Sequence, residues 1–167
     1  MKIFLIGPMG SGKSKIGRIL SEKLSISLFD IDKEIEKDLN MSITEIFASK
    51  GEIFFRNTET DYLIKTKGLR ECIVSTGGGV IEEIKNLEFL KKEANVVFLN
   101  CSVESQYENT KNSAKRPLLL TKDPKLTLQT LYEKRFDSYK EVSKLELLSD
   151  SMSNDEIANK IINHFNV

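Results

Sequence analysis

The residues with the clearest chemical potential lie near the amino terminus, where residues 7–14 (GPMGSGKS) match the pattern G-x-x-x-x-G-K-[ST] of phosphate-binding loops. Glycines let such a loop turn tightly, so that successive backbone N–H groups point at phosphate oxygens. We expect Lys13 to reach the β- and γ-phosphates of a nucleotide and the Ser14 hydroxyl to ligate magnesium. A glycine-rich turn that only caps a helix is the alternative. The residues expected around the phosphates are Gly10, Ser11, Gly12, Lys13 and Ser14.

Two flanking elements must position this loop. Residues 3–6 form an unbroken apolar run of strand length, and four apolar residues recur afterwards at helical spacing: Ile16, Ile19, Leu20 and Leu24. The positive end of the new helix adds to the attraction for phosphate. The sequence therefore predicts strand, loop and helix in the order that nucleotide binding requires.

A pair of carboxylates, Asp30 and Asp32, follows a second short strand predicted over residues 27–29. In an extended segment, residues two apart point to the same side, so both aspartates can face the space above the strand ends. Magnesium and a reacting hydroxyl would have to meet there. The alternative is that Asp32 caps the helix that follows. The two interpretations are compatible.

Helix signals fill residues 33–67 and are interrupted twice, at a capping box formed by Ser42 and Glu45 and again at Gly51. We interpret this stretch as a helical insertion after the second strand. Within it, Arg56 follows two phenylalanines, and a planar guanidinium can hold a carboxylate with two hydrogen bonds. Spacing alone favours the other interpretation, a surface salt bridge.

A third strand is predicted over residues 72–75 and leads directly into Thr76 and the triglycine of residues 77–79. The carboxyl end of a parallel strand is where ligands bind in open α/β sheets, and backbone without side chains permits close approach. A flexible turn is the alternative. Next we expect a helix over 80–93, with Ile81, Ile84, Leu87 and Leu90 on one face, and a buried strand over 95–99.

Residues 108–125 are polar and carry Lys111, Lys115, Arg116 and Lys122. A connection of this length is usually a functional lid or a solvated loop. Arg116 precedes an apolar anchor, residues 117–120, which favours a lid that brings a cation over the triphosphate. A helix from Leu126 then carries Arg135 towards the same cleft, followed by a fifth strand over 145–148. A last helix begins after Ser153, which forms a capping box with Glu156.

Length and composition exclude several classes of protein. The 167 residues fit one domain, and 25 basic residues balance 25 acidic ones, which argues against a nucleic-acid-binding role. No apolar run approaches the roughly 20 residues of a membrane span, so we expect a cytoplasmic protein that makes no membrane contact. Cys72 and Cys101 lack metal-ligand spacing and are expected to be reduced.

The single histidine, His164, suits a helix C-terminus better than catalysis. No exposed apolar stripe indicates a dimer, so we expect a monomer.

Missing motifs narrow the choice among phosphate-loop proteins. The third and fourth strands end in Thr76 and Asn100 rather than in the Asp-Glu pair of a motor ATPase, and the guanine-reading Asn-Lys-x-Asp motif is absent. What remains is a small kinase that moves the γ-phosphoryl group of ATP to a second substrate. Asp30 or Thr76 would help to hold magnesium.

Taken together, the motifs resemble those of the shikimate kinase family over almost the whole chain. The phosphate loop alone is common to many NTPases, but the combination of this loop with five further motifs is specific to the family. These are Asp-x-Asp at 30–32, Gly-Glu-x-x-Phe-Arg at 51–56, Thr-Gly-Gly-Gly at 76–79, Arg-Pro-Leu-Leu at 116–119, and Arg135 with Tyr139 four residues later.

The resemblance implies a three-layer α/β P-loop NTPase fold like that of nucleoside-monophosphate kinases. A five-stranded parallel sheet in the order 2-3-1-4-5 would be flanked by helices. One domain would span residues 1–167, with a substrate-binding insertion at about 33–67 and a lid at about 109–124.

The resemblance also implies that the chain uses ATP and Mg²⁺ to phosphorylate the 3-hydroxyl of shikimate. By similarity, the catalytic residues are Lys13, Asp32 and Arg116, and the metal residues are Ser14 and Asp30. Shikimate would be held by Asp32, Arg56, Gly78, Gly79 and Arg135, with the two arginines on its carboxylate. Arg116 would join the phosphate loop at the nucleotide.

Two departures from the family pattern concern the proposed sites. Asp137 adds a carboxylate two residues after Arg135, but helical geometry directs it to solvent. Asn109 stands where many relatives carry a nucleotide-binding arginine, and Lys111 is the candidate substitute. The alternatives are a gluconate- or nucleotide-kinase-like enzyme of the same fold and a non-catalytic nucleotide-binding regulator.

Overall fold

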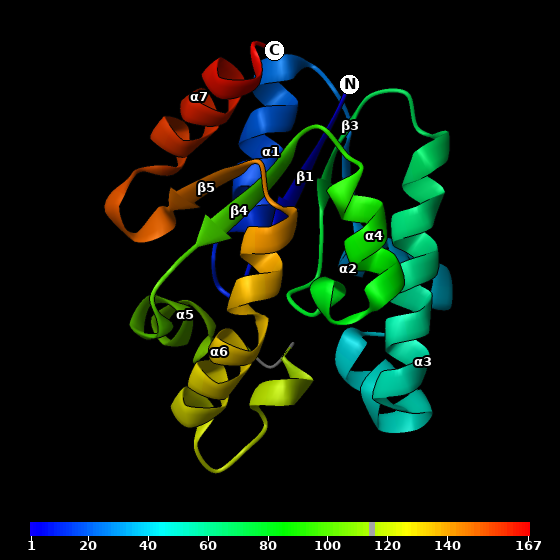
Figure 1. Ribbon diagram of the computed structural model, residues 1–167. Helices are drawn as coiled ribbons and strands as arrows, with labels where there is room; N and C mark the ends of the chain where they lie inside the picture. Colours follow the sequence, from blue (N-terminus) through cyan, green and yellow to red (C-terminus); the bar gives the residue numbers. More distant parts are fainter. Residues whose placement is uncertain (114–115) are drawn as a thin grey trace.

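A five-stranded, wholly parallel sheet forms the centre of the computed structural model, which describes residues 1–113 and 116–167 (Figure 1). Its strands are β1 (Lys2–Ile6), β2 (Leu28–Asp30), β3 (Cys72–Ser75), β4 (Val96–Asn100) and β5 (Leu145–Leu148). They lie in the order β2-β3-β1-β4-β5, and each neighbouring pair is parallel. This confirms the fold class and the 2-3-1-4-5 strand order.

Helices cover both faces of the sheet (Figure 1). One face is covered by α1 (Lys13–Leu24) and α7 (Asn154–Phe165). The other is covered by α2 (Ile31–Leu39), α3 (Ile43–Lys65), α4 (Ile84–Lys91) and α6 (Pro124–Val142), while α5 (Val103–Thr110) packs against α6. Four 3-10 turns complete the described chain: Thr66–Gly68, Val80–Glu82, Pro117–Leu119 and Ser149–Ser151.

Strand β1 shows how the sequence builds two cores. From Ile3 to Ile6 its residues are apolar without interruption because both of its faces are covered. Ile3 and Leu5 belong to the core under α1 and α7, whereas Phe4 and Ile6 belong to the core under α2, α3, α4 and α6. Successive side chains point to opposite faces of a strand, so one run supplies both layers.

The region around the two aspartates differs from the expectation. Strand β2 ends at Asp30 and helix α2 begins at Ile31, so Asp30 and Asp32 do not share an extended segment. Asp30, not Asp32, is the N-cap, and its side chain accepts a hydrogen bond from the Lys33 N–H. The helix begins two residues earlier than the capping alternative required, because the carboxylate that ends the strand also caps the helix.

The predicted helix over residues 80–93 is also wrong in part. A 3-10 turn, Val80–Glu82, is separated from α4 by Glu83, whose backbone is extended. Ile84 consequently turns outward and is 72% exposed, while Ile81 and Leu90 are buried as expected. The two capping boxes and the break at Gly51, where φ is 82°, are confirmed. Within the described residues, no helix is long and apolar enough to cross a membrane.

Candidate active site

The phosphate loop joins β1 to α1 at the carboxyl edge of the sheet. Gly10 and Gly12 adopt positive φ angles of 78° and 90°, which most side chains disfavour. Gly12 is also the N-cap of α1, so the first helical N–H groups face the loop. The loop thereby has the glycine-dependent backbone that the sequence motif predicts, and we expect its N–H groups to form the concave set of donors.

Lys13 is almost fully buried beneath this loop. Its Nζ donates 2.7 Å hydrogen bonds to the carbonyls of Gly7 and Pro8, and it lies 3.4 Å from the Ser11 hydroxyl. Burial lowers the pKa of Lys13 to about 8, with a further contribution from the positive charge of Arg116, although Asp32 and Asp30 oppose this change. A buried ammonium of this kind is well suited to binding phosphate oxygens.

Ser14 and Asp30 bring a hydroxyl and a carboxylate together at the start of α1. The Ser14 hydroxyl donates a 2.6 Å hydrogen bond to Oδ2 of Asp30 and lies 3.4 Å from the Ser75 hydroxyl. Oxygen donors of this type are those that Mg²⁺ prefers. The Thr76 hydroxyl, by contrast, donates to the carbonyl of Leu5 at 3.1 Å, so Asp30 fits a metal better than Thr76 does.

Asp32 projects from the first turn of α2 into the same region. Its Oδ1 is inaccessible to solvent and has no hydrogen-bond partner among the described residues. Burial raises the pKa of Asp32, and the nearby charge of Asp30 adds to this effect, whereas the cations Arg116, Lys13 and Arg56 oppose it. A buried carboxylate oxygen without a partner is costly. It therefore marks a place where a substrate hydroxyl could donate a hydrogen bond.

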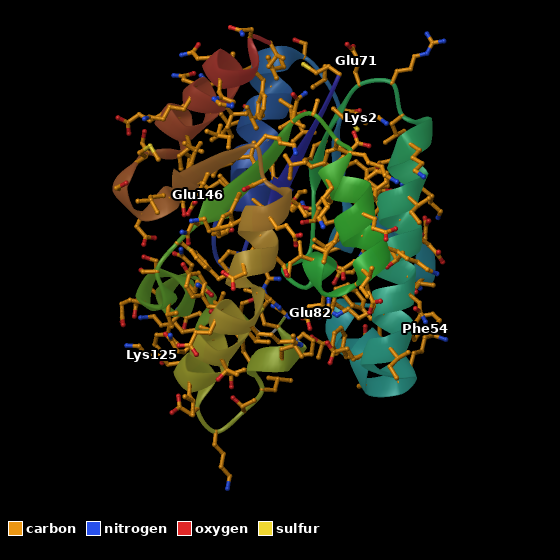
Figure 2. All side chains as sticks on the ribbon, viewed as in Figure 1. Lys2, Phe54, Glu71, Glu82, Lys125 and Glu146 are labelled. Carbon is orange, nitrogen blue, oxygen red and sulfur yellow. The ribbon has the colours of Figure 1, made fainter. Side chains whose placement is uncertain are left out.

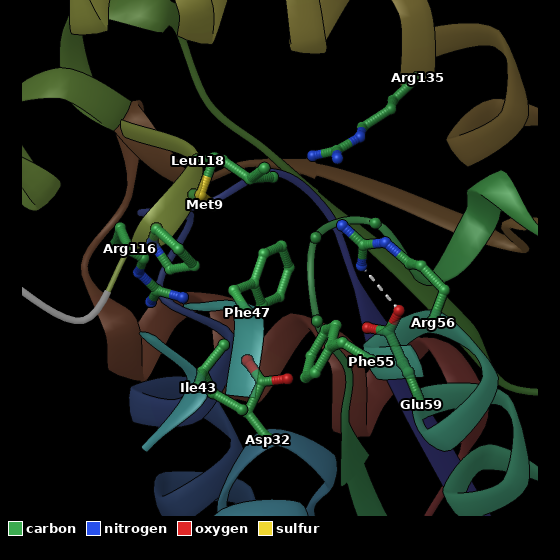
Figure 3. A pocket seen from close by; sticks show the side chains of 14 residues that line it. Met9, Asp32, Ile43, Phe47, Phe55, Arg56, Glu59, Arg116, Leu118 and Arg135 are labelled. Carbon is green, nitrogen blue, oxygen red and sulfur yellow. Dashed lines mark hydrogen bonds and ion pairs between the residues drawn. The ribbon is translucent and has the colours of Figure 1, made fainter. Parts of the chain in front are cut away.

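Arg56 and Arg135 approach one cavity from different helices, α3 and α6 (Figure 3). Arg56 donates to Oε2 of Glu59 at 2.8 Å and to Oε1 of Glu52 at 3.0 and 3.2 Å. Its guanidinium also lies 5.4 Å from the centre of the Phe55 ring. Arg135 is 2% exposed and is held by Glu82. Two buried guanidinium groups thus converge where a planar anion can bind.

Glu59 lies beside Arg56 at this cavity and has no exposed surface (Figure 3). Burial raises its pKa to about 7, Arg56 opposes this change, and the charge of Asp32 adds to it. Its second oxygen, Oε1, has no hydrogen-bond partner among the described residues. Glu59 is therefore a strongly perturbed carboxyl group that touches Arg56 directly.

Two of the three glycines, Gly77 and Gly79, pack so closely against these groups that a side chain would not fit. A Cβ atom on Gly79 would overlap the guanidinium of Arg56, and one on Gly77 would overlap Oε1 of Glu59. The Tyr139 hydroxyl, four residues after Arg135 on α6, donates to the carbonyl of Gly78. Gly79 is therefore needed for close approach to Arg56, and Gly77 for close approach to Glu59, which favours a packed turn over a merely flexible one.

Two neighbouring cavities meet at Arg116 and Asp32. One extends along the phosphate loop towards Ser149 and Asn154, and the other is enclosed by the two arginines, Phe47, Phe55 and Leu118. Both are lined by Met9, Asp32, Gly77, Gly78 and Arg116. In Figure 3, Arg116 lies across the second cavity from Arg56 and Arg135. A group bound along the phosphate loop would therefore adjoin a molecule held by the arginines.

One predicted nucleotide contact lies away from this arrangement. Lys111 is exposed, forms an ion pair with Glu108, and lines a hollow between the end of α5 and residues 116–124 rather than the phosphate-loop cavity, although Arg116 lines both. Asn109 does line that cavity and donates a 2.9 Å hydrogen bond to the carbonyl of Gly10. Asp137 faces solvent, as expected. Ala114 and Lys115, within the expected lid, lie outside the described residues.

Sequence reasoning missed three residues of this site: Ser75, Glu59 and Glu82. Glu59 follows Arg56 by three residues on a helix, which is a spacing that pairs charges and could have identified it. Ser75 ends a strand beside the phosphate loop, but nothing in its spacing distinguishes it. Glu82 contacts a residue 53 positions away, so only the fold reveals its role.

The fold and the site together are those of a P-loop kinase with a second cavity that is lined by two arginines. A family model described as shikimate kinase matches residues 9–166. The chain is 40% identical over 162 residues to a shikimate kinase from Marinomonas sp. (strain MWYL1), an alignment that covers 96% of this chain and 89% of the relative. The chain belongs to the shikimate kinase family.

Solved structures agree with this assignment. The structure described as shikimate kinase from Acinetobacter baumannii in complex with shikimate superposes with a TM-score of 0.95 at 36% identity, covering 98% of this chain and 92% of the other. Shikimate kinase from Bacteroides thetaiotaomicron superposes with a TM-score of 0.89 at 26% identity, covering 100% of this chain and 99% of the other. The likeness therefore extends over the helices that enclose the arginine-lined cavity.

Proposed function

We propose that this chain transfers the γ-phosphoryl group of ATP to the 3-hydroxyl of shikimate and releases ADP and shikimate 3-phosphate. The observation that carries the proposal is that Asp32 and Arg116 line both the phosphate-loop cavity and the arginine-lined cavity. Direct phosphoryl transfer requires donor and acceptor to be adjacent and aligned. Family membership supplies the identity of the acceptor.

We assign the nucleotide to the phosphate loop. Backbone N–H groups of Gly10, Ser11 and Gly12 would bind phosphate oxygens, and Lys13 would exchange its carbonyl partners for the β- and γ-phosphates. Because Arg116 lines the junction of the two cavities, its charge would act on the group in transfer. The polar segment at about 109–124, which carries Arg116, would close as a lid. Lys111 would need to move with that segment to reach the nucleotide.

Magnesium fits beside Ser14 and Asp30. Ser14 would ligate the ion directly, and Asp30 would hold it through water, with phosphate oxygens supplying further ligands. When bound, Mg²⁺ neutralises charge that develops on the phosphate oxygens. The one carboxylate and one hydroxyl suit an ion that usually keeps several waters.

Shikimate would occupy the arginine-lined cavity. Its carboxylate would bind Arg56 and Arg135, since guanidinium groups match carboxylates geometrically. The backbone of Gly78 and Gly79 would contact the ring closely, and the helical insertion at about 33–67 would close the cavity with Phe47 and Phe55. The hydroxyl that attacks would donate a hydrogen bond to Asp32, which orients it.

The chemistry then demands little more than alignment and compensation of charge. Phosphoryl transfer passes through a loose transition state with negative charge spread over the phosphoryl oxygens. Lys13 and Arg116 supply positive charge there, and Asp32 holds the acceptor oxygen in place and can receive its proton. No strong base is required.

We further propose that the enzyme is a monomer and that it acts in the cytoplasm, where ATP is available. Cys72 and Cys101 are both buried free thiols, which suits a reducing compartment.

Product analysis tests the proposed reaction. After incubation of the protein with Mg-ATP and shikimate, mass spectrometry should detect a monophosphorylated shikimate, and ³¹P coupling should place the phosphate on the 3-oxygen. A phosphate on another hydroxyl, or only free phosphate, would contradict the proposal.

A further inference from the structure

Arg135 is hydrogen-bonded to Glu82 along one edge of its guanidinium group. Its Nε and Nη2 both donate to Oε1 of Glu82, at 2.8 and 2.5 Å. The remaining nitrogen, Nη1, faces the triglycine, since a Cβ atom on Gly78 would lie 3.6 Å from it. The Nε and Nη2 edge of Arg135 is thus occupied by the Glu82 carboxylate, whereas Nη1 faces Gly78, which lines both cavities.

Arg56 is held in a different way. Glu52 accepts from its Nε and Nη2, and Glu59 accepts from its Nη1, so all three nitrogens already contact carboxylates. Among the described residues, Arg135 therefore presents the edge that is less compensated by carboxylates. Its orientation matters correspondingly more for binding an anion.

Glu82 is placed by the triglycine itself. It ends the 3-10 turn that follows Gly79, and its N–H donates a 2.9 Å hydrogen bond to the Gly79 carbonyl. Figure 2 shows Glu82 where this turn meets α6. The turn that would contact shikimate therefore also fixes the arginine that would bind the carboxylate of shikimate.

The charges around Glu82 keep it in this role. Its second oxygen forms an ion pair with Lys134, and its side chain is 19% exposed while that of Arg135 is 3% exposed. Burial opposes ionisation of Glu82, but hydrogen bonds and charges from Lys134 and Arg135 outweigh it and lower its pKa. A buried guanidinium needs such a partner because an unpaired buried charge is costly.

We propose that Glu82 is a positioning residue for shikimate recognition, which holds Arg135 by its Nε and Nη2 edge so that Nη1 is directed at the substrate carboxylate. The proposal rests on the proposed function. It adds a residue that makes no substrate contact of its own and lies outside the motifs on which the family resemblance depends.

Steady-state kinetics of Glu82→Ala and Glu82→Gln test this role. Glu82→Ala should raise the KM for shikimate about tenfold, because charge-assisted hydrogen bonds are typically worth that much or more. KM for ATP and kcat should stay within about twofold. Glu82→Gln should recover most of the shikimate affinity, since its amide oxygen can still accept from Nε and Nη2. Glu83→Ala is the matched control, because Glu83 lines the same outer groove without hydrogen bonds to either arginine among the described residues, and it should match the wild type.

A double-mutant comparison separates positioning from general stability. Shikimate binding measured by calorimetry should weaken on Glu82→Ala in the wild-type background but not further in an Arg135→Ala background. The inference would be overturned by an unchanged shikimate KM in Glu82→Ala, or by a shikimate KM in Glu82→Gln as high as that in Glu82→Ala. It would also be overturned if Glu82→Ala weakened shikimate binding in the Arg135→Ala background as much as in the wild type. In each case, turnover of shikimate by the wild type would leave the proposed function intact. Absence of shikimate turnover by the wild type would overturn both.

Discussion

Nη1 of Arg56 lies 2.8 Å from Oε2 of Glu59, and Glu59 has no exposed surface. The arginine that we propose to bind the substrate is therefore anchored to a carboxylate that solvent does not reach. Because burial raises the pKa of Glu59 to about 7, this anchor changes its charge near neutral pH.

The free energy of unfolding should fall as the pH rises from about 4.5 to about 7, because of Glu59. The raised pKa of Glu59 means that the folded protein holds a proton more tightly than the unfolded chain. The stabilising contribution is full below the ordinary pKa of 4.5 and is lost as the pH rises to about 7. Relative to Glu59→Gln, the wild type should lose about 3 kcal/mol of unfolding free energy across this window, at about 1.4 kcal/mol per pKa unit.

Urea unfolding of both proteins from pH 4 to pH 8 measures this difference. Glu52→Gln is the control, because it removes the other carboxylate on Arg56 from a solvent-exposed position, and it should keep the pH dependence of the wild type. A difference between wild type and Glu59→Gln that does not vary with pH would show that folding does not raise the pKa of Glu59.

Gly79→Ala should weaken shikimate binding without changing ATP binding. The backbone of Gly79 has φ of −94°, which alanine tolerates, but the new Cβ would displace the Arg56 guanidinium. We expect a rise of about tenfold or more in the shikimate KM, the usual scale for a lost charge-assisted contact. In an Arg56→Ala background, Gly79→Ala should cause little further loss, because the group that its Cβ displaces is already gone. A loss of equal size in that background would mean that the contact with Arg56 is not the cause.

Asp30→Asn isolates the proposed metal role of that residue. Asparagine is as good an N-cap as aspartate, so α2 should remain intact. Loss of the negative charge should raise the Mg²⁺ concentration for half-maximal velocity about tenfold, with most of kcat recovered at saturating Mg²⁺. Velocity titrated with MgCl₂ at fixed ATP measures this. An unchanged Mg²⁺ requirement would remove Asp30 from the metal site.

Asp32→Asn should abolish turnover while leaving ATP affinity unchanged. The substitution preserves shape, but an amide cannot receive the proton of the attacking hydroxyl, so kcat should fall at least about 100-fold. ATP binding measured by calorimetry serves as the control for folding. Full turnover in Asp32→Asn would exclude Asp32 from the mechanism.

Most of the fold could be predicted because its signals are local. The apolar runs at residues 3–6 and 96–99 each mark a strand, the capping boxes at Ser42 and Ser153 each mark a helix start, and Gly51 marks a break. The errors arose where one residue serves two elements. Asp30 ends a strand and caps a helix in the same position, and Glu83 separates two short helical pieces that share one apolar pattern.

The site was less accessible from the sequence. Lys13, Ser14 and Gly79 belong to recognisable motifs. The spacing of the family motifs also predicted Arg56 and Arg135 as site residues. The partners that hold those arginines, Glu59 and Glu82, are ordinary surface-type residues in the sequence. Glu82 reaches Arg135 only because α6 folds back over the turn after β3.

The most direct test of the central claim is a substrate panel. Purified protein with Mg-ATP should release ADP in step with added shikimate, and should release almost none with gluconate, a nucleoside monophosphate or no acceptor. Turnover with gluconate or a nucleoside monophosphate but not with shikimate would contradict the assignment of the arginine-lined cavity to shikimate.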